Sequence, residues 1–429
     1  MSEVPLLRVS DLKLHFPTDE GDVRALENVN FEIGRGEIFG LVGESGSGKS
    51  VSSLTVIGLS TGNIDSGQIH FGDEELLSAP KERMRAIRGN DISMIFQEPM
   101  TALNPLYTVE KQIHEVMSLH EKLPLAKLNA IERMYVGMRT SISKPISRLI
   151  SIFQNPRGYR PSGNDILAIL SLLSAYLLLS SAPIFSMFLI GFLLVSWLLS
   201  SMNTLDSVHA EVIVERLRDV QIPNPSAVAK MYPHELSGGM RQRVMIAMMM
   251  ACEPKLLIAD EPTTALDVTI QSQIVELMKE LRNNRGTSIL LITHDIGLVA
   301  EMCERVGVMY AGSIVEQGTI EQILESPRMP YTIGLMHSIP SIGETRDELP
   351  IIPGQVPDPI NLPSGCKFHP RCPFADDKCQ SQNPPMIDLG DGHLASCHHL
   401  DKTESMSEVK DAFDSFVSEL EARGGEILA

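Results

Sequence analysis

Basic residues and cysteines are scarce in this sequence of 429 residues, and no internal repeat is apparent. The 36 Lys and Arg residues are outnumbered by 54 Asp and Glu residues, so the net charge of −18 excludes the basic field that a nucleic-acid coat needs. Six cysteines are too few for a disulfide scaffold, which indicates a reducing compartment. The first 16 residues lack a basic start followed by an apolar stretch, so no secretory signal is expected.

The apolar share of 43% is ordinary for a folded chain and excludes disorder throughout. Short apolar runs alternate with longer runs of helical period, which predicts an α/β protein with a mostly parallel sheet and crossover helices. Helices are expected after Gly48 and over Ile270–Asn283. The expected strands are Leu7–Val9, Asn28–Ile33, Glu37–Val42, Gly67–Phe71, Ile92–Phe96, Leu256–Ala259, Ser288–Thr293 and Val306–Tyr310.

A glycine-rich segment, GESGSGKS at positions 43–50, follows the apolar strand Ile38–Val42 and matches the pattern G-x-x-x-x-G-K-[ST]. Its glycines let the backbone curl so that successive N–H groups point at phosphate oxygens. Lys49 is expected to reach the terminal phosphates, and the Ser50 hydroxyl to coordinate Mg²⁺. The expected nucleotide-binding residues of the loop are Gly43, Ser45, Gly46, Gly48, Lys49 and Ser50.

An apolar strand that ends in two acidic residues, LLIADE at positions 256–261, supplies the second half of such a site. Asp260 is placed to hold Mg²⁺ through water, and Glu261 to orient and deprotonate the attacking water. Strands often end in this way at solvated turns, so the strand end is informative only together with the glycine loop. The two motifs together predict a nucleoside triphosphatase.

The segment LSGGMRQR at positions 236–243 resembles the signature sequence of ATP-binding cassette (ABC) proteins, and the remaining family elements follow in order. The resemblance implies that Gln97 is the Q-loop glutamine, which also contacts Mg²⁺, and that His294 is the switch histidine at the γ-phosphate. It implies that Asp267 belongs to the D-loop and that Phe16 stacks on adenine. The implied catalytic residues are Glu261, His294 and Gln97.

The signature residues Ser237, Gly238 and Gly239 begin a helix, and N–H groups at a helix N-terminus form an anion site. In the ABC family this site closes on the ATP of the opposite subunit. The resemblance therefore implies that the chain is one half of a cassette dimer. Its second half is expected to be a paralogue, with an identical copy as the alternative.

Three further segments resemble the ATP-binding subunits of dipeptide and oligopeptide importers, whose relatives handle nickel or glutathione: EPMTALNP at 98–105, YPHE at 232–235 and DEPTTALDVT at 260–269. The resemblance covers residues 6–122 and 210–400. It implies an ATP-hydrolysing, energy-coupling subunit that works with two transmembrane permease subunits and, indirectly, an extracytoplasmic substrate-binding protein. Its place would be the cytoplasmic face of the cell (inner) membrane.

Two other functions are compatible with an ABC cassette. A soluble ABC ATPase that acts on DNA or ribosomes would carry two cassettes or basic surfaces, and this chain has one cassette and an acidic balance. A binding regulator without ATPase activity would have lost Glu261 or His294, and both are present. A peptide cargo is expected, with nickel or glutathione as alternatives.

The C-terminal part holds four of the six cysteines, Cys366, Cys372, Cys379 and Cys397, in a Pro-rich segment too short for its own core. Four thiols suggest tetrahedral ligation of Zn²⁺ or an iron–sulfur cluster, with free or structural thiols as the third interpretation. The importer resemblance implies a [4Fe-4S] binding loop. Cys252 and Cys303 are expected to be buried and inert. Four nearby histidines are expected at the surface: His369, His393, His398 and His399.

An apolar insertion is expected in the middle of the chain, where residues 166–205 contain no Asp, Glu, Lys, Arg or His. Residues 163–182 and 183–202 each have the length of a membrane-spanning helix. Gln97 and the signature must meet ATP on the same side, so an even number of crossings is required. A hairpin anchor at about 163–202 is predicted on this ground. A pair of helices lying in the interface or against a permease, and a segment without structure or transport role, are the alternatives.

The resulting fold prediction is an α/β P-loop NTPase, an ABC cassette with a RecA-like core, a helical subdomain that carries the apolar insertion, and a Cys-rich C-terminal extension. The expected parts are the first part of the core with the P-loop at 1–97, the helical subdomain at 98–235 with the insertion at about 135–208, the second part of the core at 236–325, the extension at 326–400 and an amphipathic tail at 401–429.

Overall fold

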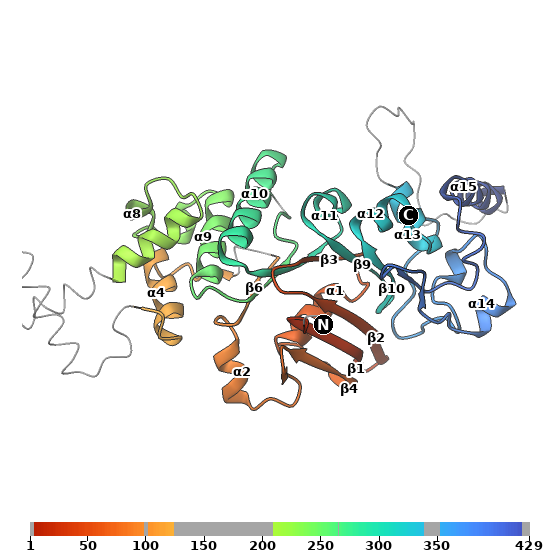
Figure 1. The fold of residues 1–429 in the computed structure, drawn as a ribbon, viewed down its shortest axis with the longest axis horizontal. Helices are drawn as coiled ribbons and strands as arrows, with labels where there is room; N and C mark the ends of the chain where they lie inside the picture. The colour runs from red at the N-terminus through yellow and green to blue at the C-terminus, as the bar shows by residue number, and fades with distance from the viewer. Residues whose placement is uncertain (1–3, 98–101, 124–208, 265, 339–351, 423–429) are drawn as a thin grey trace, which may run out of the picture. The chain divides into compact units, whose positions relative to one another are not determined.

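The computed structural model describes residues 4–97, 102–123, 209–264, 266–338 and 352–422 (Figure 1). These residues form two compact units, one made of Met1–Asn104 and Pro233–Ala429, the other of Pro105–Tyr232. Each unit is described separately below. The apolar insertion expected at about 135–208, with the hairpin at 163–202, lies outside the described residues.

An eight-stranded sheet is the centre of the first unit, in the order β11-β12-β10-β9-β3-β8-β7-β6. Its five strands from β9 to β6 pair in parallel, and the other three add to one edge in antiparallel fashion. The strands β3, β7 and β8 are buried throughout, as in a sheet covered on both faces. The bounds are β3 Ile38–Val42, β6 Ile92–Ile95, β7 Leu256–Asp260, β8 Ser288–Thr293, β9 Arg305–Tyr310, β10 Ser313–Thr319, β11 Ile387–Asp388 and β12 Leu394–Ala395.

A separate antiparallel sheet is present in addition to the mostly parallel sheet that the sequence predicts. It has the order β2-β1-β4-β5, and Figure 1 shows β1, β2 and β4 side by side. The first two strands form a hairpin and are far longer than expected, because alternate positions are buried along most of their length. The bounds are β1 Leu7–Thr18, β2 Gly21–Ile33, β4 Asn63–Phe71 and β5 Glu74–Glu75.

Five helices of the first unit, α9, α10, α11, α12 and α14, begin at a capping side chain. Helix α10 is longer than expected because Asp267 caps its start and Gly286, at φ 66°, ends it. The bounds are α1 Lys49–Val56, α2 Lys81–Ile87, α9 Gly238–Met250, α10 Val268–Arg285, α11 Ile296–Met302, α12 Ile320–Glu325, α13 Pro330–His337, α14 Asp377–Ser381 and α15 Met406–Ala422, with 3₁₀ turns η1 Pro233–Glu235 and η2 His369–Arg371.

The second unit is helical in its described part. Helix α4 spans Val109–Leu119 and is capped by Thr108, whose hydroxyl accepts from the Lys111 amide at 3.4 Å. Residues 209–219 are also helical, and the short helix α8 spans Pro225–Val228. Across both units, the described part of the chain contains no helix with the length and apolar character that a membrane crossing requires.

The chain from residue 352 to 422, called the C-terminal extension below, shares a core with the large sheet. The Phe368 ring lies 5.2 Å from that of Tyr310 on β9 and 5.4 Å from that of Tyr331 on α13. Phe413 of α15 lies 6.5 Å from Phe368, and Val409 beside it is buried. The extension is therefore held to the first unit's sheet by aromatic packing.

One of the four histidines near the cysteines is not at the surface. His393 is buried, and its Nε2 lies 2.8 Å from Oε1 of the fully buried Glu316 on β10. The contact between His393, which directly precedes β12, and Glu316 on β10 allows both polar groups to be buried. Cys252 and Cys303 are buried as expected, and burial raises the pKa of Cys303.

Candidate active site

The glycine-rich loop lies between β3 and α1, at the carboxyl end of a central parallel strand. Gly43 has φ 150°, and a Cβ there would lie 2.2 Å from the Met309 carbonyl oxygen. Gly48 has φ 101°, and a Cβ there would lie 2.7 Å from the Ala25 carbonyl oxygen. Both positions thus require glycine for conformation and for space. Gly46, at φ 79°, lies in the exposed turn with Ser45, and a Cβ there would meet no atom within 4 Å.

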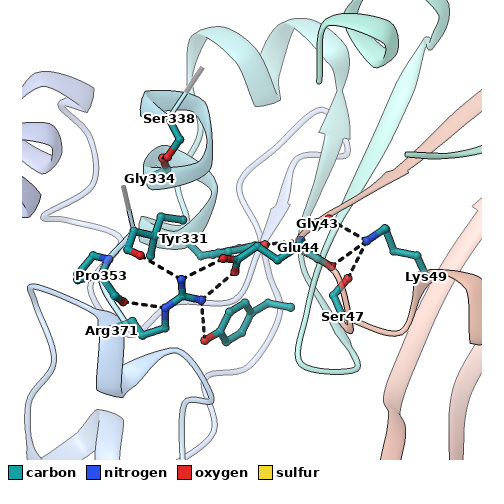
Figure 2. A network of polar contacts seen from close by, with 11 residues as sticks. Gly43, Glu44, Ser47, Lys49, Tyr331, Gly334, Ser338, Pro353 and Arg371 are labelled. Carbon is teal, nitrogen blue, oxygen red and sulfur yellow. Dashed lines mark hydrogen bonds and ion pairs between the residues drawn. The ribbon is translucent and has the colours of Figure 1, made fainter. Parts of the chain in front are cut away.

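Lys49 is the buried cation of this loop. Its Nζ donates to the carbonyls of Gly43 and Glu44 at 2.8 Å each and to the Ser47 hydroxyl at 3.3 Å (Figure 2). Burial lowers the pKa of Lys49, and the negative charges of Glu261, Asp260 and Glu44 act against this effect. The three hydrogen bonds hold the ammonium group at the loop.

Ser50 and Asp260 are brought together although 210 residues separate them. The Ser50 hydroxyl donates to Oδ1 of Asp260 at 3.1 Å. The contact follows from the strand order, since β3 and β7 flank β8 and end at the same edge of the sheet. Burial raises the pKa of Asp260, and the Ser50 hydrogen bond opposes the rise. A carboxylate and a hydroxyl oxygen beside a phosphate loop fit Mg²⁺, which prefers oxygen ligands.

Glu261 is the point where the three expected catalytic residues meet. Its Oε2 accepts from Gln97 Nε2 and from the Thr264 hydroxyl, both at 2.9 Å, and its Oε1 lies 3.0 Å from His294 Nδ1. Gln97, Glu261 and His294 follow the adjacent strands β6, β7 and β8. Burial acts to raise the pKa of Glu261, but the bonds from His294, Thr264 and Gln97 outweigh it and lower the pKa. The side chain is therefore an ionised carboxylate at neutral pH.

The backbone at Glu261 turns sharply away from the strand. Its φ of 47° lies in the left-handed region, and its amide donates to the Ile292 carbonyl of β8 at 2.8 Å. Such a conformation is costly for a residue with a side chain and is characteristic of functional sites. It directs the carboxylate toward the ends of β6 and β8.

The signature residues lie at the start of α9. Ser237 caps this helix by accepting from the Met240 amide at 3.4 Å, and both Ser237 and Gly238 are exposed. A Cβ on Gly239 would lie 3.0 Å from Ile270 of α10, so glycine permits close packing there. Among the described residues, no hydrogen bond joins these three positions to the glycine-rich loop. An exposed helix start is what an anion site for a second subunit requires.

Two residues expected to contact nucleotide also have structural roles within this chain. Phe16 is half-buried against the core of the antiparallel sheet. Asp267 accepts from the Ile270 amide at 3.0 Å and so caps α10. Their roles in stacking on adenine and in the D-loop remain predictions.

Three polar contacts at the site were not anticipated from the sequence. Thr264 binds the Glu261 carboxylate, and the buried Gln242 of α9 donates to the Pro262 carbonyl at 2.5 Å. Glu44 of the glycine-rich loop pairs with Arg371, 327 residues away. Thr264 stands three residues after Glu261 and could have been found by spacing. The other two depend on contacts that no local pattern encodes.

The four cysteines of the C-terminal extension gather in one place. The Cys366 amide donates to the Cys379 carbonyl at 2.7 Å. Burial raises the pKa of Cys372, and negative charge on Cys397, Cys366 and Cys379 raises it further. Burial also raises the pKa of Cys397 to about 11. All four are free thiols, so the set is compatible with thiolate ligation of a metal group.

A smaller set of possible metal ligands overlaps this group. Atoms of Asp376, Cys379 and His399 lie within 4.8 Å of one another, and in the described part of the chain no other set of three His, Cys, Asp or Glu ligands does. Asp376 also has a structural role, because its Oδ1 caps α14 by accepting from the Cys379 amide at 2.9 Å. The backbone amide and side chain of Cys379 are the main reason why the pKa of Asp376 falls to about 2.

A glycine loop on a parallel strand, an Asp-Ser pair and a hydrogen-bonded glutamate on neighbouring strands define a P-loop nucleoside triphosphatase. The family model "ABC transporter" matches residues 26–264, and "Oligopeptide/dipeptide transporter, C-terminal region" matches residues 315–379. The chain therefore belongs to the ABC transporter ATP-binding proteins, in their oligopeptide/dipeptide group. The family resemblance seen in the sequence is confirmed, and the chain is an ABC-type ATPase.

Curated relatives cover most of the chain. It is 36% identical over 396 residues to the dipeptide transport ATP-binding protein DppD of Escherichia coli (strain K12). This match covers 92% of this chain and 96% of the relative. It is 40% identical over 395 residues to the oligopeptide transport ATP-binding protein AppD of Bacillus subtilis (strain 168), covering 91% and 96%. Among solved structures, the dimeric bacterial ABC transporter cassette MJ0796 aligns at 20% identity with a TM-score of 0.49, over 73% of this chain and 98% of that one.

Proposed function

We propose that this ATPase drives peptide import by hydrolysing ATP between the Gly43–Ser50 loop and the Glu261 carboxylate. The observation that carries the proposal is the position of Glu261, which accepts hydrogen bonds from Gln97 and Thr264 and contacts His294 beside the loop. An ionised carboxylate in this place can accept a proton from a water molecule that attacks the γ-phosphate. The peptide cargo is supported by the relatives that transport dipeptides and oligopeptides.

The loop and its neighbours divide the work of binding. Backbone N–H groups of the glycine-rich loop would hold the phosphates, and the Lys49 ammonium would balance their negative charge. Ser50 and Asp260 would hold Mg²⁺, which when bound neutralises charge on the phosphate oxygens. His294 and Gln97, as partners of Glu261, keep its carboxylate ionised and oriented. These residues lie at or shortly after the carboxyl ends of β3, β6, β7 and β8, so the order of these strands sets their positions.

The proposed working unit is a dimer of cassettes. Ser237, Gly238 and Gly239 would contact the ATP held by a second subunit, a paralogue or an identical copy, since they lie at the exposed start of α9. Two permease subunits would carry the cargo across the membrane, and an extracytoplasmic binding protein would deliver it. The chain would accordingly work at the cytoplasmic face of the membrane.

A [4Fe-4S] cluster on Cys366, Cys372, Cys379 and Cys397 is part of the proposal. A single Zn²⁺ ion with Zn–S bonds of about 2.3 Å would bring its sulfur ligands to about 3.8 Å from one another. Among the described residues, no three of these cysteines lie within 4.8 Å of one another. Four free thiols are the ligand set that a [4Fe-4S] cluster takes, and this cluster is the group proposed here, with Zn²⁺ as the alternative.

The apolar segment at 163–202 is proposed to anchor the chain as a membrane hairpin. The support is in the sequence, because two stretches of bilayer-spanning length follow one another without a charge between residues 166 and 205. Both ends of a hairpin return to the same side, so Gln97 and the signature would still meet ATP together.

Reconstitution with the neighbouring permeases and binding protein tests the proposed function. Uptake of a labelled dipeptide into proteoliposomes that depends on ATP is the expected result. The same vesicles loaded with ATP and offered nickel or glutathione distinguish the alternatives. ATP-dependent uptake of either, without peptide uptake, would replace the proposed cargo, and the absence of ATP hydrolysis would overturn the proposed site.

A further inference from the structure

The second residue of the phosphate-binding loop, Glu44, is held by the C-terminal part of the chain through almost all of its polar groups. Its amide donates to the Tyr331 hydroxyl of α13 at 3.0 Å. Its carboxylate accepts from Nη1 and Nη2 of Arg371 at 2.8 and 3.0 Å. Its carbonyl accepts from Lys49 Nζ at 2.8 Å and from the Ser47 amide at 3.2 Å. Figure 2 shows Arg371 and Lys49 on opposite sides of Glu44.

Arg371 is built to hold this position. Besides its two bonds to Glu44, its guanidinium donates to the carbonyls of Pro353 and Ile352 at 2.9 and 3.2 Å and to the Tyr310 hydroxyl at 3.4 Å. An arginine side chain has five N–H donors, and these five bonds occupy all of them. The side chain is 4% exposed, so water does not replace a missing partner. A lysine, with a single ammonium group, cannot reproduce the fork.

The loop needs such support, because three of its eight residues are glycines with positive φ. Gly43, Gly46 and Gly48 have φ values of 150°, 79° and 101°, and glycine by itself selects none of them. The Glu44 carbonyl is also one of the groups that position Lys49. A displacement of Glu44 would therefore move both the backbone that faces phosphate and the cation that balances it.

We propose that Arg371 is a positioning residue for ATP binding: through Glu44 it holds the phosphate-binding loop in its working conformation. The C-terminal extension then contributes to the nucleotide site indirectly, through Glu44. This inference rests on the ATP site proposed above, which is assigned through other residues. Arg371 contacts neither Glu261 nor its partners, so its effect should fall on ATP affinity more than on the chemical step.

The test compares Arg371→Gln, Arg371→Lys and Glu44→Gln in the full complex, with KM for ATP and kcat measured together with MgATP affinity. For Arg371→Gln and Glu44→Gln, we expect KM and the dissociation constant to rise about 3- to 30-fold, the range of residues that act through others. The value of kcat at saturating ATP should stay within about threefold of wild type, because Glu261 keeps its partners. Arg371→Lys should recover part of the affinity. The double variant should be no weaker than the weaker single variant, since both break one contact.

Arg328→Gln is the matched control. Arg328, which precedes α13, donates to the Leu400 carbonyl at 2.7 Å and lies 3.7 Å from Glu404, so it ties the extension to the rest of the unit without contacting the loop. This variant should lower the unfolding temperature while KM for ATP stays at the wild-type value. The iron and zinc content of every variant is measured as well, because Arg371 is next to Cys372.

Wild-type affinity for MgATP in both Arg371→Gln and Glu44→Gln would overturn this inference and leave the proposed function intact. A wild-type complex that does not bind MgATP would instead refute the proposed function. If Arg371→Gln does not fold, Glu44→Gln decides alone, since it leaves the three other bonds of Arg371 in place. A loss of kcat with unchanged KM would also overturn the positioning role.

Discussion

Replacing Glu261 by Gln removes one negative charge and changes little else at the site. The amide keeps the size of the side chain and retains an oxygen that can accept from Gln97 and Thr264. The loop and the Ser50–Asp260 pair are not in contact with the exchanged atom, so MgATP affinity should stay within about threefold of wild type. An amide cannot take a proton from water, and general-base catalysis contributes about 10²- to 10⁴-fold to a rate. The expected loss in turnover corresponds to about 2.7 to 5.4 kcal/mol of the barrier.

The assay measures phosphate release and nucleotide binding in the same assembled complex. Glu276→Gln serves as the control, because this carboxylate lies on α10 with 65% of its side chain exposed, and among the described residues its ion pair is a 4.0 Å contact with Lys279. It should leave turnover unchanged. A Glu261→Gln complex that keeps more than about a tenth of the wild-type turnover would show that another group activates the water. A loss of MgATP binding would show instead that Glu261 supports the nucleotide site itself.

Three further changes test the other parts of the proposal. Lys49→Ala should weaken MgATP binding about 10- to 100-fold, because it removes a charge-assisted contact to phosphate; equilibrium binding measures this, and an unchanged affinity would contradict the role of Lys49. Anaerobically purified wild type should contain about four iron atoms per chain and absorb broadly at the blue end of the visible range. The Cys372→Ser variant should lose both the iron and the absorption. Stoichiometric zinc without iron would show that the site binds zinc and not a cluster. Deleting residues 141–203 should release the separately expressed chain from membranes after a carbonate wash, whereas a wild-type chain that washes off would disprove the spanning hairpin.

Much of the site follows from local sequence. The loop at 43–50, Asp260 and Glu261 could be assigned because phosphate binding and water activation require particular residues at short, regular spacing after a strand. The ABC signature was equally readable, since Ser237, Gly238 and Gly239 are consecutive. These features lie within a few residues of one another, so their geometry is set by one strand end or one helix start.

The tertiary structure decided which of these distant segments contact one another. The sequence did not separate the antiparallel sheet of β1, β2 and β4 from the parallel one. The residue pattern of a strand shows that the segment is extended, but it does not show which other strand will pair with it. It did not show that the extension shares an aromatic core with β9 and α13, since Phe368 and Tyr310 are far apart in the chain.

The lowered pKa of Glu261 also results from the tertiary structure. The sequence by itself determined that Glu261 follows a strand, and the order of β6, β7 and β8 brought Gln97 and His294 to its carboxylate and lowered its pKa. The pairing of Glu44 with Arg371 spans 327 residues and requires the extension to be packed on the core. Hydrogen bonds between distant segments depend on the whole fold because each partner's position is set by a different element.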